Sequence, residues 1–304
     1  MQPFKIYILG CGSALPTQKH NPSSQVVEIR GKLFMIDCGE GTQTSIRRSK
    51  KNFNKLYAIF ISHIHGDHVL GLIGLLSTMG LQGRTAPIHV YAPEDYETLF
   101  KMEIETFCST LDYEIIFHPV DTSLRKIIYE DRSLTVETLP LNHRMPCAGF
   151  IFREKQGLRH INPDKVAAYE IPSSQLNNLR AGHDWTAPDG TTIPNEELTT
   201  PADPTRAYAY CSDTRYMPSL AKELKGVDTL YHEATYSEDM KEKAVKYLHS
   251  TAREAAMTAK DAGVKQLLLG HYSKRYLDET PLLKEAKEVF PNTFLTDEGK
   301  VFTL

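Results

Sequence analysis

The chain has 304 residues, of which 41% are hydrophobic and 24% are charged. This composition is ordinary for a globular protein and excludes disordered and collagen-like chains, and no apolar run approaches the roughly 20 residues of a membrane helix. The 35 Lys and Arg residues and 38 Asp and Glu residues leave a net charge of −3, which excludes a global attraction to nucleic acid. The first ten residues lack the long apolar stretch of a signal peptide, so we expect a cytoplasmic location.

Short apolar runs recur along the chain and predict strands. They cover residues 4–9, 26–29, 33–36, 58–61, 134–141, 207–211, 229–231 and 266–269. Continuous apolar runs of this length are typical of strands that are buried on both faces. Many of them are followed by polar residues, which include Asp37, His63, His143, Asp213, His232 with Glu233, and His271.

Helical patterns lie between the predicted strands. Asp67 to Met79 begins with an Asp at an N-cap position, Ser250 to Ala262 carries a capping signal, and Pro281 to Phe290 begins with a first-turn Pro. Sheets with helices on their outer faces are the layered solution for such a pattern. We therefore expect a single α/β layered domain over residues 1–304.

The segment from Lys155 to Thr205 interrupts this pattern. Hydrophobic residues become sparse there, and the segment holds four Lys and Arg residues against seven Asp and Glu residues. A long stretch without a strong core pattern inside a compact domain is usually functional or disordered. We interpret it as an excursion from the domain and not as a domain boundary.

Basic residues and cysteines provide no clear site by themselves. One basic cluster is interpreted as the solvated end of a helix and consists of Arg47, Arg48, Lys50, Lys51 and Lys55. The five cysteines are scattered and none has CxxC spacing, so neither a disulfide framework nor a thiolate zinc site is expected.

The sharpest local signal is the string Ser62-His63-Ile64-His65-Gly66-Asp67-His68. It places alternating histidines at the end of a strand, and Asp67 and His68 at the head of a helix. Imidazole and carboxylate ligands suit Zn²⁺, and four of them within six residues are too many for one metal with an open position. The string therefore predicts two adjacent metals, which together activate a water and clamp a phosphate.

Two metals need more ligands than this string provides. Polar residues that follow the other strands are the candidates, because binding sites in sheet proteins collect at such junctions. This context favours His143, Asp213 and His271 as ligands. His20, His89, His118, His160 and His183 lack the context and are interpreted as ordinary polar residues.

The motifs resemble those of the metallo-β-lactamase superfamily and, within it, the ribonuclease Z family of tRNA 3′-processing endonucleases in its short form. The similarity covers essentially the whole chain, and the elements that carry it are Phe34 to Gln43, the HxHxDH string, Leu141 to His143, Tyr210 to Arg215, His232 to Thr235, His249 to Thr251, and Gly270 to Tyr276. The resemblance implies an αββα sandwich with a two-metal site at one edge. It also implies that residues 155–205 are an inserted arm that binds tRNA.

The resemblance further implies a role for each site residue. In this scheme His63, His65 and His143 hold one Zn²⁺, with Mn²⁺ as an alternative metal, and Asp213 bridges to a second ion held by Asp67, His68 and His271. Asp67 is also the general base. His249, supported by Glu233, would protonate the departing ribose oxygen, and Arg275 would contact the phosphate or the discriminator base. Asp37 would orient ligands from behind, and His232 would be structural.

The sequence departs from the family pattern in two places. The loop Pro16 to Asn21 has His20 where the family often has Arg, which leaves the rejection of transcripts that carry CCA open. In the arm, Ile171-Pro172 is followed by Ser173-Ser174 where Gly-Pro is usual. The family also implies a homodimer whose arm reaches the tRNA held by the partner subunit.

Three function classes remain to be separated. The leading hypothesis is a zinc-dependent endoribonuclease that acts on precursor tRNA. A hydrolase of small phosphodiesters, sulfate esters or thioesters needs neither the arm nor His249 and Arg275. A nucleic-acid-binding protein without catalysis is disfavoured because the ligand set is complete.

Overall fold

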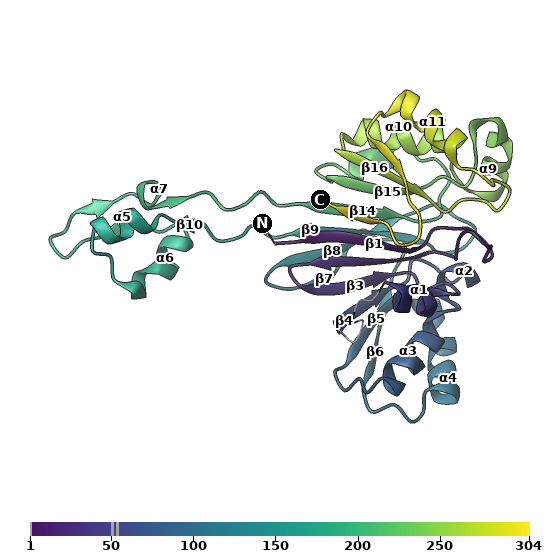
Figure 1. Cartoon of the computed structure of the whole chain (residues 1–304), viewed down its shortest axis with the longest axis horizontal. Helices are drawn as coiled ribbons and strands as arrows, with labels where there is room; N and C mark the ends of the chain where they lie inside the picture. Colours follow the sequence, from purple (N-terminus) through teal and green to yellow (C-terminus); the bar gives the residue numbers. More distant parts are fainter. Residues whose placement is uncertain (1, 50–51, 53–54) are drawn as a thin grey trace.

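In the computed structural model, residues 2–49, 52 and 55–304 are described, so Lys50 and Lys51 of the basic cluster lie outside the described residues. Two large sheets pack face to face, and helices cover the outer face of each (Figure 1). This is the αββα sandwich that the family resemblance implies. Within the described ranges, no helix is both long and apolar enough to cross a membrane.

In the first sheet, parallel strands converge on the edge of the sandwich that carries the site. In the described residues its strand order is β18 (Val301–Thr303), β1 (Phe4–Gly10), β2 (Ser24–Ile29), β3 (Lys32–Ile36), β4 (Leu56–Phe60), β5 (Ile88–Pro93) and β6 (Ile115–Val120). Strands β3 to β6 are mutually parallel, so the residues that follow β3 and β4 lie at the same edge.

The second sheet directs further strand ends to one edge. Its order is β17 (Thr293–Leu295), β16 (Gln266–Gly270), β15 (Thr229–Glu233), β14 (Ala207–Cys211), β9 (Ala148–Glu154), β8 (Leu134–Pro140) and β7 (Ile127–Glu130). Strands β14 to β17 are parallel, and β8 runs in the same direction because both β8 and β14 are antiparallel to β9. The ends of β8, β14, β15 and β16 therefore lie together.

Aromatic side chains fill the space between the two sheets. The Phe60 ring lies 5.5 Å from the Phe150 ring, and the Phe34 ring lies 5.9 Å from the Phe152 ring. In each pair, one ring belongs to the first sheet and the other to the second. Fully burying each such side chain stabilises the fold by about 1.5–3 kcal/mol. This core fixes the relative position of the two edges that carry the site.

Helices on the outer faces complete the layers. The helices over the first sheet are α1 (Thr42–Arg48), α3 (Leu72–Leu81) and α4 (Glu97–Phe107), and those over the second are α8 (Leu220–Glu223), α10 (Ala252–Ala262) and α11 (Thr280–Val289) (Figure 1). Helix α10 begins at the capping box of Thr251 and Glu254, as the sequence predicts. Helix α9 (Lys241–Tyr247) and the short turns Glu94–Tyr96 and Glu238–Met240 lie in the connections.

The prediction of one helix from Asp67 to Met79 is wrong. The structure has α2 (Gly66–Val69) and a separate α3, and His65 occupies the N-cap position. Gly71 separates the helices where the chain meets the loop after β3: its N–H donates to the carbonyl of Cys38 at 2.9 Å, and a Cβ there would lie 2.2 Å from the Gly39 oxygen. Asp67 does not cap because its carboxylate turns to the site.

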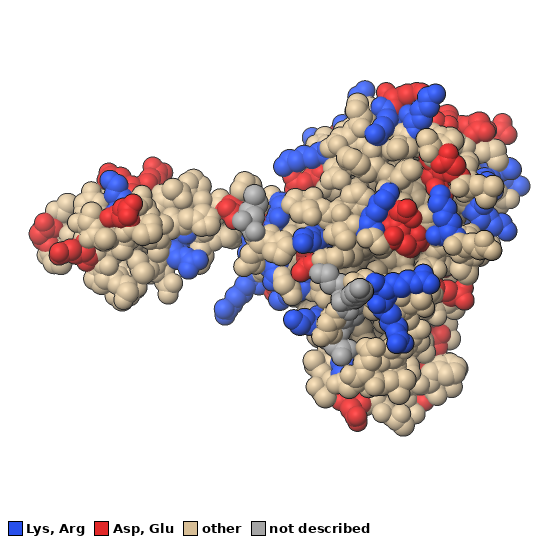
Figure 2. Space-filling model, in the orientation of Figure 1, with Lys and Arg blue, Asp and Glu red and all other residues tan. Residues whose placement is uncertain are grey.

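Residues 155–205 project away from the sandwich between β9 and β14 (Figure 1). The segment contains β10 (His160–Ile161), α5 (Pro163–Ala168), the turn Ser173–Gln175, α6 (Leu176–Arg180), β11 (Trp185–Thr186), β12 (Thr192–Ile193), α7 (Asn195–Leu198) and β13 (Thr199–Thr200). Its own small core consists of Ile171, Leu179, Trp185, Ile193 and Leu198. On the face in Figure 2, acidic side chains mark its outer end, and basic ones gather on the sandwich.

Candidate active site

The edge shared by the two sheets brings together seven residues predicted to bind metal. They are His63, His65, Asp67, His68, His143, Asp213 and His271. The first sheet contributes the HxHxDH string after β4, and the second contributes His143 after β8, Asp213 after β14 and His271 after β16. Residues far apart in the sequence meet here because all these strands end at the same edge.

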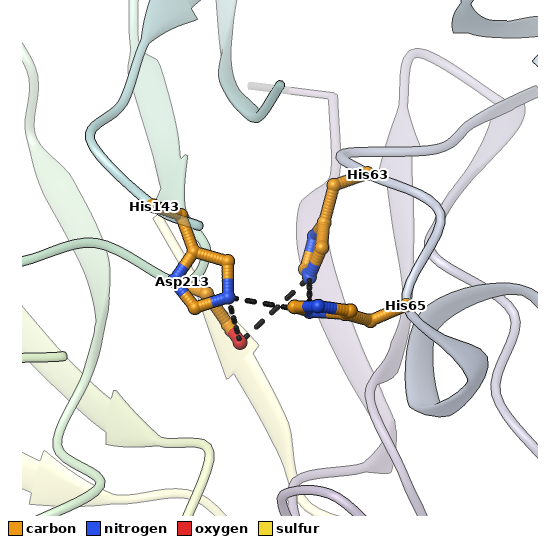
Figure 3. Close-up of side chains that lie close together, drawn as sticks. All are labelled: His63, His65, His143 and Asp213. Atoms are coloured by element: carbon orange, nitrogen blue, oxygen red, sulfur yellow. Dashed lines mark hydrogen bonds and ion pairs between the residues drawn. The ribbon is translucent and has the colours of Figure 1, made fainter. Parts of the chain in front are cut away.

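One set of four donors surrounds a common point and is drawn in Figure 3. His63 Nε2 lies 3.0 Å from His65 Nδ1, and His143 Nε2 lies 3.2 Å from the same atom. Asp213 Oδ2 lies 3.7 Å from both His63 Nε2 and His143 Nε2. The four potential ligand atoms all lie within 4.8 Å of one another, and three imidazoles with a carboxylate suit Zn²⁺.

The other oxygen of Asp213 faces a second set of donors. Asp213 Oδ1 lies 3.1 Å from His271 Nε2 and 3.5 Å from His68 Nε2. Asp67 Oδ2 lies 3.4 Å from His271 Nε2 and 3.5 Å from His68 Nε2. A carboxylate between two donor sets is positioned to bridge two cations.

Unsatisfied polar atoms indicate that this second set is built for a cation. Among the described residues, His68 Nε2, His271 Nε2 and Asp213 Oδ1 are buried without a hydrogen-bond partner. A buried polar atom without a partner costs about 1–3 kcal/mol, and three of them facing one another are compensated by a shared ligand. The donor set therefore fits a metal ion.

The imidazoles are oriented by hydrogen bonds at their rear nitrogens. His68 Nδ1 lies 2.8 Å from an Asp37 oxygen, His143 Nδ1 lies 3.0 Å from the Leu248 carbonyl oxygen, and His271 Nδ1 lies 2.8 Å from the Thr235 hydroxyl. Donation of the Nδ1 proton to these oxygens leaves the Nε2 lone pair directed into the site, which is the tautomer that binds a metal.

Burial and charge set the protonation of the cluster. Burial lowers the pKa of His63, His65 and His143, so these imidazoles are neutral, as metal ligands must be. Burial also opposes a charge on His68, but Asp67, Asp213 and Asp37 raise the pKa of that imidazole well above its ordinary value. The three carboxylates therefore favour a positive charge at this position, which a bound cation would supply in place of the His68 Nε2 proton.

His249 and Glu233 form a buried pair beside the cluster. His249 Nδ1 lies 2.9 Å from Glu233 Oε1, and the His249 ring lies 5.0 Å from the His143 ring. Burial disfavours the charged imidazole, but Glu233 outweighs this effect and raises the pKa of His249 to about 9. His249 therefore carries a proton at neutral pH and can donate it.

Four residues at the site adopt left-handed backbone conformations that residues other than glycine rarely adopt. The φ angles are 65° at Ala14, 55° at Asp37, 56° at Leu248 and 58° at His271. Such conformations cost about 1–3 kcal/mol each and occur preferentially where function requires them. At Asp37, Leu248 and His271 they turn the chain sharply where a strand or helix meets the site.

A cavity of about 650 Å³ opens over the cluster. The Arg275 guanidinium lies in its lining, 4.8 Å from the centre of the Tyr236 ring, and its Nε donates to the Ser273 hydroxyl at 3.0 Å. Arg275, the residue predicted to contact substrate, thus lies at the border of the site. In the described part of the chain its guanidinium has no carboxylate partner. His232 lies outside the cluster and hydrogen-bonds through Nδ1 to the Glu233 carbonyl oxygen at 2.8 Å.

The structure adds residues that the sequence analysis missed. Thr235 donates its hydroxyl proton to Glu233 Oε2 at 2.5 Å and so links Glu233 to His271. The Ala14 N–H donates to Asp67 Oδ2 at 2.7 Å. Thr235 belongs to the His-Glu-Ala-Thr motif, so the sequence could have indicated its role. The contact of the Ala14 N–H could not be predicted, because every residue except proline has a backbone N–H.

His20 also proved different from the ordinary polar residue predicted. It is buried, and its ring nitrogens lie 2.7 Å from Glu298 Oε2 and 3.2 Å from Glu279 Oε1. Cys11 Sγ lies 3.3 Å from His20 Nδ1. These contacts fasten the loop that carries Ala14, and their partners are too distant in sequence to be recognised there.

Two family models match parts of the chain, and full-length relatives match all or nearly all of it. The family model of anti-Pycsar protein Apyc1 matches residues 4–157, and the β-lactamase superfamily domain matches residues 185–272. Ribonuclease Z of Bacteroides fragilis is 52% identical over 304 residues and covers all of both chains. Ribonuclease Z of Bacteroides thetaiotaomicron is 50% identical and covers 100% of this chain and 96% of its own.

A solved structure shows the same fold. The short form of human tRNase Z superposes with a TM-score of 0.71 at 24% identity and covers 98% of each chain. That likeness shows the metallo-β-lactamase sandwich, and the full-length identity of about one half shows the closer relationship. The chain belongs to the ribonuclease Z family.

Proposed function

We propose that this chain is a zinc-dependent endoribonuclease that removes the 3′ trailer from tRNA precursors. It cuts after the discriminator nucleotide and leaves a 3′-hydroxyl on the tRNA and a 5′-phosphate on the trailer. The observation that carries the proposal is the pair of donor sets sharing Asp213, with the His249–Glu233 pair beside them. Full-length identity to curated ribonuclease Z proteins supports the substrate class.

The donor sets assign the residues that would hold two Zn²⁺ ions per chain, with Mn²⁺ as the alternative. His63, His65 and His143 would hold one ion, Asp67, His68 and His271 the other, and Asp213 would bridge them. When bound, a pair of such ions supplies a nucleophilic water near neutral pH and charge to stabilise the phosphoryl oxygens.

Asp67 takes the proton of the attacking water. Burial opposes ionisation of its carboxyl, but the imidazoles of His68 and His271 hold the pKa of Asp67 well below its usual range. The group is therefore a carboxylate at every working pH, and the Ala14 N–H fixes one of its oxygens at 2.7 Å. This contact directs the carboxylate into the cavity instead of toward solvent.

His249 provides the proton for the leaving group. Cleavage breaks the bond between phosphorus and the ribose 3′ oxygen, and an alkoxide is a poor leaving group unless it is protonated. His249 starts protonated because Glu233 stabilises its charge. The Glu233 carboxylate is held by the Thr235 hydroxyl at Oε2 and by the Thr214 N–H at Oε1. Arg275, which lines the cavity, would contact the phosphate or the discriminator base.

The arm is proposed to bind the tRNA at a distance from the cut. We treat residues 1–304 as one metallo-β-lactamase-type domain with the arm, residues 155–205, inserted in it. The small core of the arm supports a rigid projecting element, and the resemblance to the family implies a cytoplasmic homodimer in which each arm reaches the tRNA on the partner subunit.

Replacing Gly157 to Glu197 by a short Gly/Ser linker tests the arm. We expect a folded protein that still binds two metals and hydrolyses a small phosphodiester, because every proposed ligand lies outside this range. Its affinity for precursor tRNA should fall strongly. Unchanged affinity would show that the arm is not the tRNA contact.

Cut mapping tests the function itself. The zinc-loaded protein is incubated with a precursor tRNA, and a chelator-treated sample serves as the control. A single metal-dependent cut after the discriminator nucleotide is expected. No cut, together with rapid hydrolysis of a small phosphodiester, sulfate ester or thioester, would favour the alternative class of superfamily hydrolase.

A further inference from the structure

One wall of the active-site cavity carries the exposed Tyr247, the buried Tyr236, and cations that have no carboxylate partner among the described residues. Arg144, Tyr236, Tyr247 and Arg275 all line the cavity. The Arg144 guanidinium lies 5.9 Å and the Lys246 ammonium 5.5 Å from the centre of the Tyr247 ring. In the part of the chain that the structure describes, neither Arg144 nor Lys246 has a carboxylate partner.

The part of the lining that comes from the first sheet differs in character. From the side of the first sheet it includes Leu15, Leu70 and Glu40 and no cation. Leu15 is 40% exposed and Leu70 is 64% exposed. A polyanion that enters the cavity is therefore attracted to the wall of Arg144 and Tyr247, where Lys246 lies against the Tyr247 ring, and this wall also offers an aromatic face for stacking.

The backbone between Tyr247 and His249 fixes the position of this wall relative to the proposed general acid. Tyr247 is the last residue of α9, and Leu248 follows with φ of 56° and ψ of 49°. This turn lets the Leu248 carbonyl oxygen accept from His143 Nδ1 at 3.0 Å, while the next residue, His249, contacts Glu233. A bulky residue in the left-handed region is strained, so the turn indicates that the positions on both sides of it are fixed for function.

We propose that Arg144, Lys246 and Tyr247 form a nucleotide subsite, in which Tyr247 stacks on the discriminator base and the two cations contact its flanking phosphates. The subsite rests on the proposed function, because it requires a single-stranded RNA end in the cavity. The discriminator nucleotide is the one assigned because its 3′ oxygen receives the proton of His249, and His249 lies two residues from Tyr247. These are specificity and positioning residues, separate from the proposed metal ligands.

Aromatic stacking on a base predicts a measurable loss. Truncating a stacking aromatic residue costs about 1–3 kcal/mol per base, which corresponds to roughly 5- to 150-fold in affinity. Tyr247→Ala should therefore raise KM for precursor tRNA within that range and change kcat less. Tyr247→Phe keeps the ring and should stay close to the wild-type KM.

A substrate without the discriminator base tests the assignment by coupling. On a precursor that is abasic at this position, Tyr247→Ala should cost less than about twofold, because the partner of the ring is already gone. Equal losses on the intact and abasic substrates would overturn the proposal. Coupling to an abasic first trailer nucleotide would overturn it as well, because it would place the ring on the other side of the bond.

The cations are tested by salt dependence. Each phosphate contact to single-stranded nucleic acid contributes roughly 0.7 to the slope of log affinity against log salt concentration. Lys246→Ala and Arg144→Ala should each flatten the slope by about that amount. Lys243→Ala is the matched control, because Lys243 is exposed on the same helix but, among the described residues, does not lie over the Tyr247 ring as Lys246 does.

The controls separate this inference from the proposed function. If the Lys246 and Arg144 variants show the same salt slope as the Lys243 variant, the two cations do not contact phosphates and that part of the proposal is wrong. If the wild-type protein does not cut precursor tRNA at all, the proposed function and the subsite both fail. If it cuts correctly but shows no coupling at the discriminator, only the subsite fails.

Discussion

Asp37 provides a sharp test of how the site is supported from behind. Its buried carboxylate accepts four hydrogen bonds: from the Ser62 N–H at 2.7 Å, the Ser62 hydroxyl at 2.9 Å, His68 Nδ1 at 2.8 Å and the Tyr210 hydroxyl at 2.7 Å. Every partner is a donor. Asp37→Asn keeps the size of the side chain but replaces one acceptor oxygen by an NH₂ group.

The size of the effect follows from these contacts. In the Asp37→Asn variant, the remaining side-chain oxygen would stay with the three donors at Oδ2, so the new NH₂ would face the Ser62 N–H and that hydrogen bond would be lost. Bonds to a charged group are worth about 1.5–3 kcal/mol and bonds to a neutral one about half as much, so the hold on His68 weakens too. Loss of a carboxylate behind a ligand typically costs about 10- to 100-fold in metal affinity, or about 1.4–2.7 kcal/mol.

Chelator competition on the purified protein measures this directly. For Asp37→Asn we expect one of two zinc-binding steps, the one that involves His68, to weaken about 10- to 100-fold. The other step should change little. Asp189→Asn is the control, because Asp189 is exposed in the arm and accepts a hydrogen bond from the Thr191 N–H two residues away. Unchanged affinity for both metals in Asp37→Asn would refute the role of Asp37 in orienting His68.

Other parts of the account make separate predictions. Asp213→Ala should lose both metals, because each carboxylate oxygen faces one donor set, and elemental analysis that finds two zinc ions per chain would contradict the bridge. His249→Ala should slow cleavage of precursor tRNA about 10²- to 10⁴-fold but spare diesters with nitrophenolate leaving groups, which need no protonation; equal losses in turnover would argue against a general acid. His20→Gln should be more destabilising near pH 6 than near pH 9. Burial lowers the pKa of His20, but Glu298 and Glu279 outweigh this effect and raise the pKa above its value in the unfolded chain. The protonated imidazole therefore stabilises the fold fully below the unfolded pKa, and this stabilisation is lost as the pH rises through the folded pKa. Urea unfolding at both pH values measures this difference, and an equal loss at both would remove the ion pair as its cause.

Much of the site could be predicted because strand ends carry it. Apolar runs marked β3, β4, β8, β14, β15 and β16, and parallel strands bring their carboxyl ends to one edge whatever the details of the loops. The proposed metal ligands therefore followed from local patterns together with the family resemblance.

The remaining features depend on contacts that have no local signal. Gly71 divides the predicted helix because of a loop far earlier in the chain, and His20 is buried by carboxylates near the other end of the chain. The left-handed turn at Leu248 contradicts the backbone preference of leucine, so only tertiary contacts can impose it. The core of the arm is made from a few dispersed apolar residues, and their spacing shows no helix or strand period.

Isotope transfer during cleavage tests the central claim most directly. A precursor tRNA is cut by the zinc-loaded protein in ¹⁸O-labelled water, and both new ends are analysed by mass spectrometry. If the water oriented by Asp67 attacks the phosphorus and His249 protonates the leaving oxygen, one ¹⁸O appears in the 5′-phosphate of the trailer. The tRNA then ends in an unlabelled 3′-hydroxyl on the discriminator nucleotide. A 2′,3′-cyclic phosphate, label on the tRNA end, or a cut at another position would contradict the account.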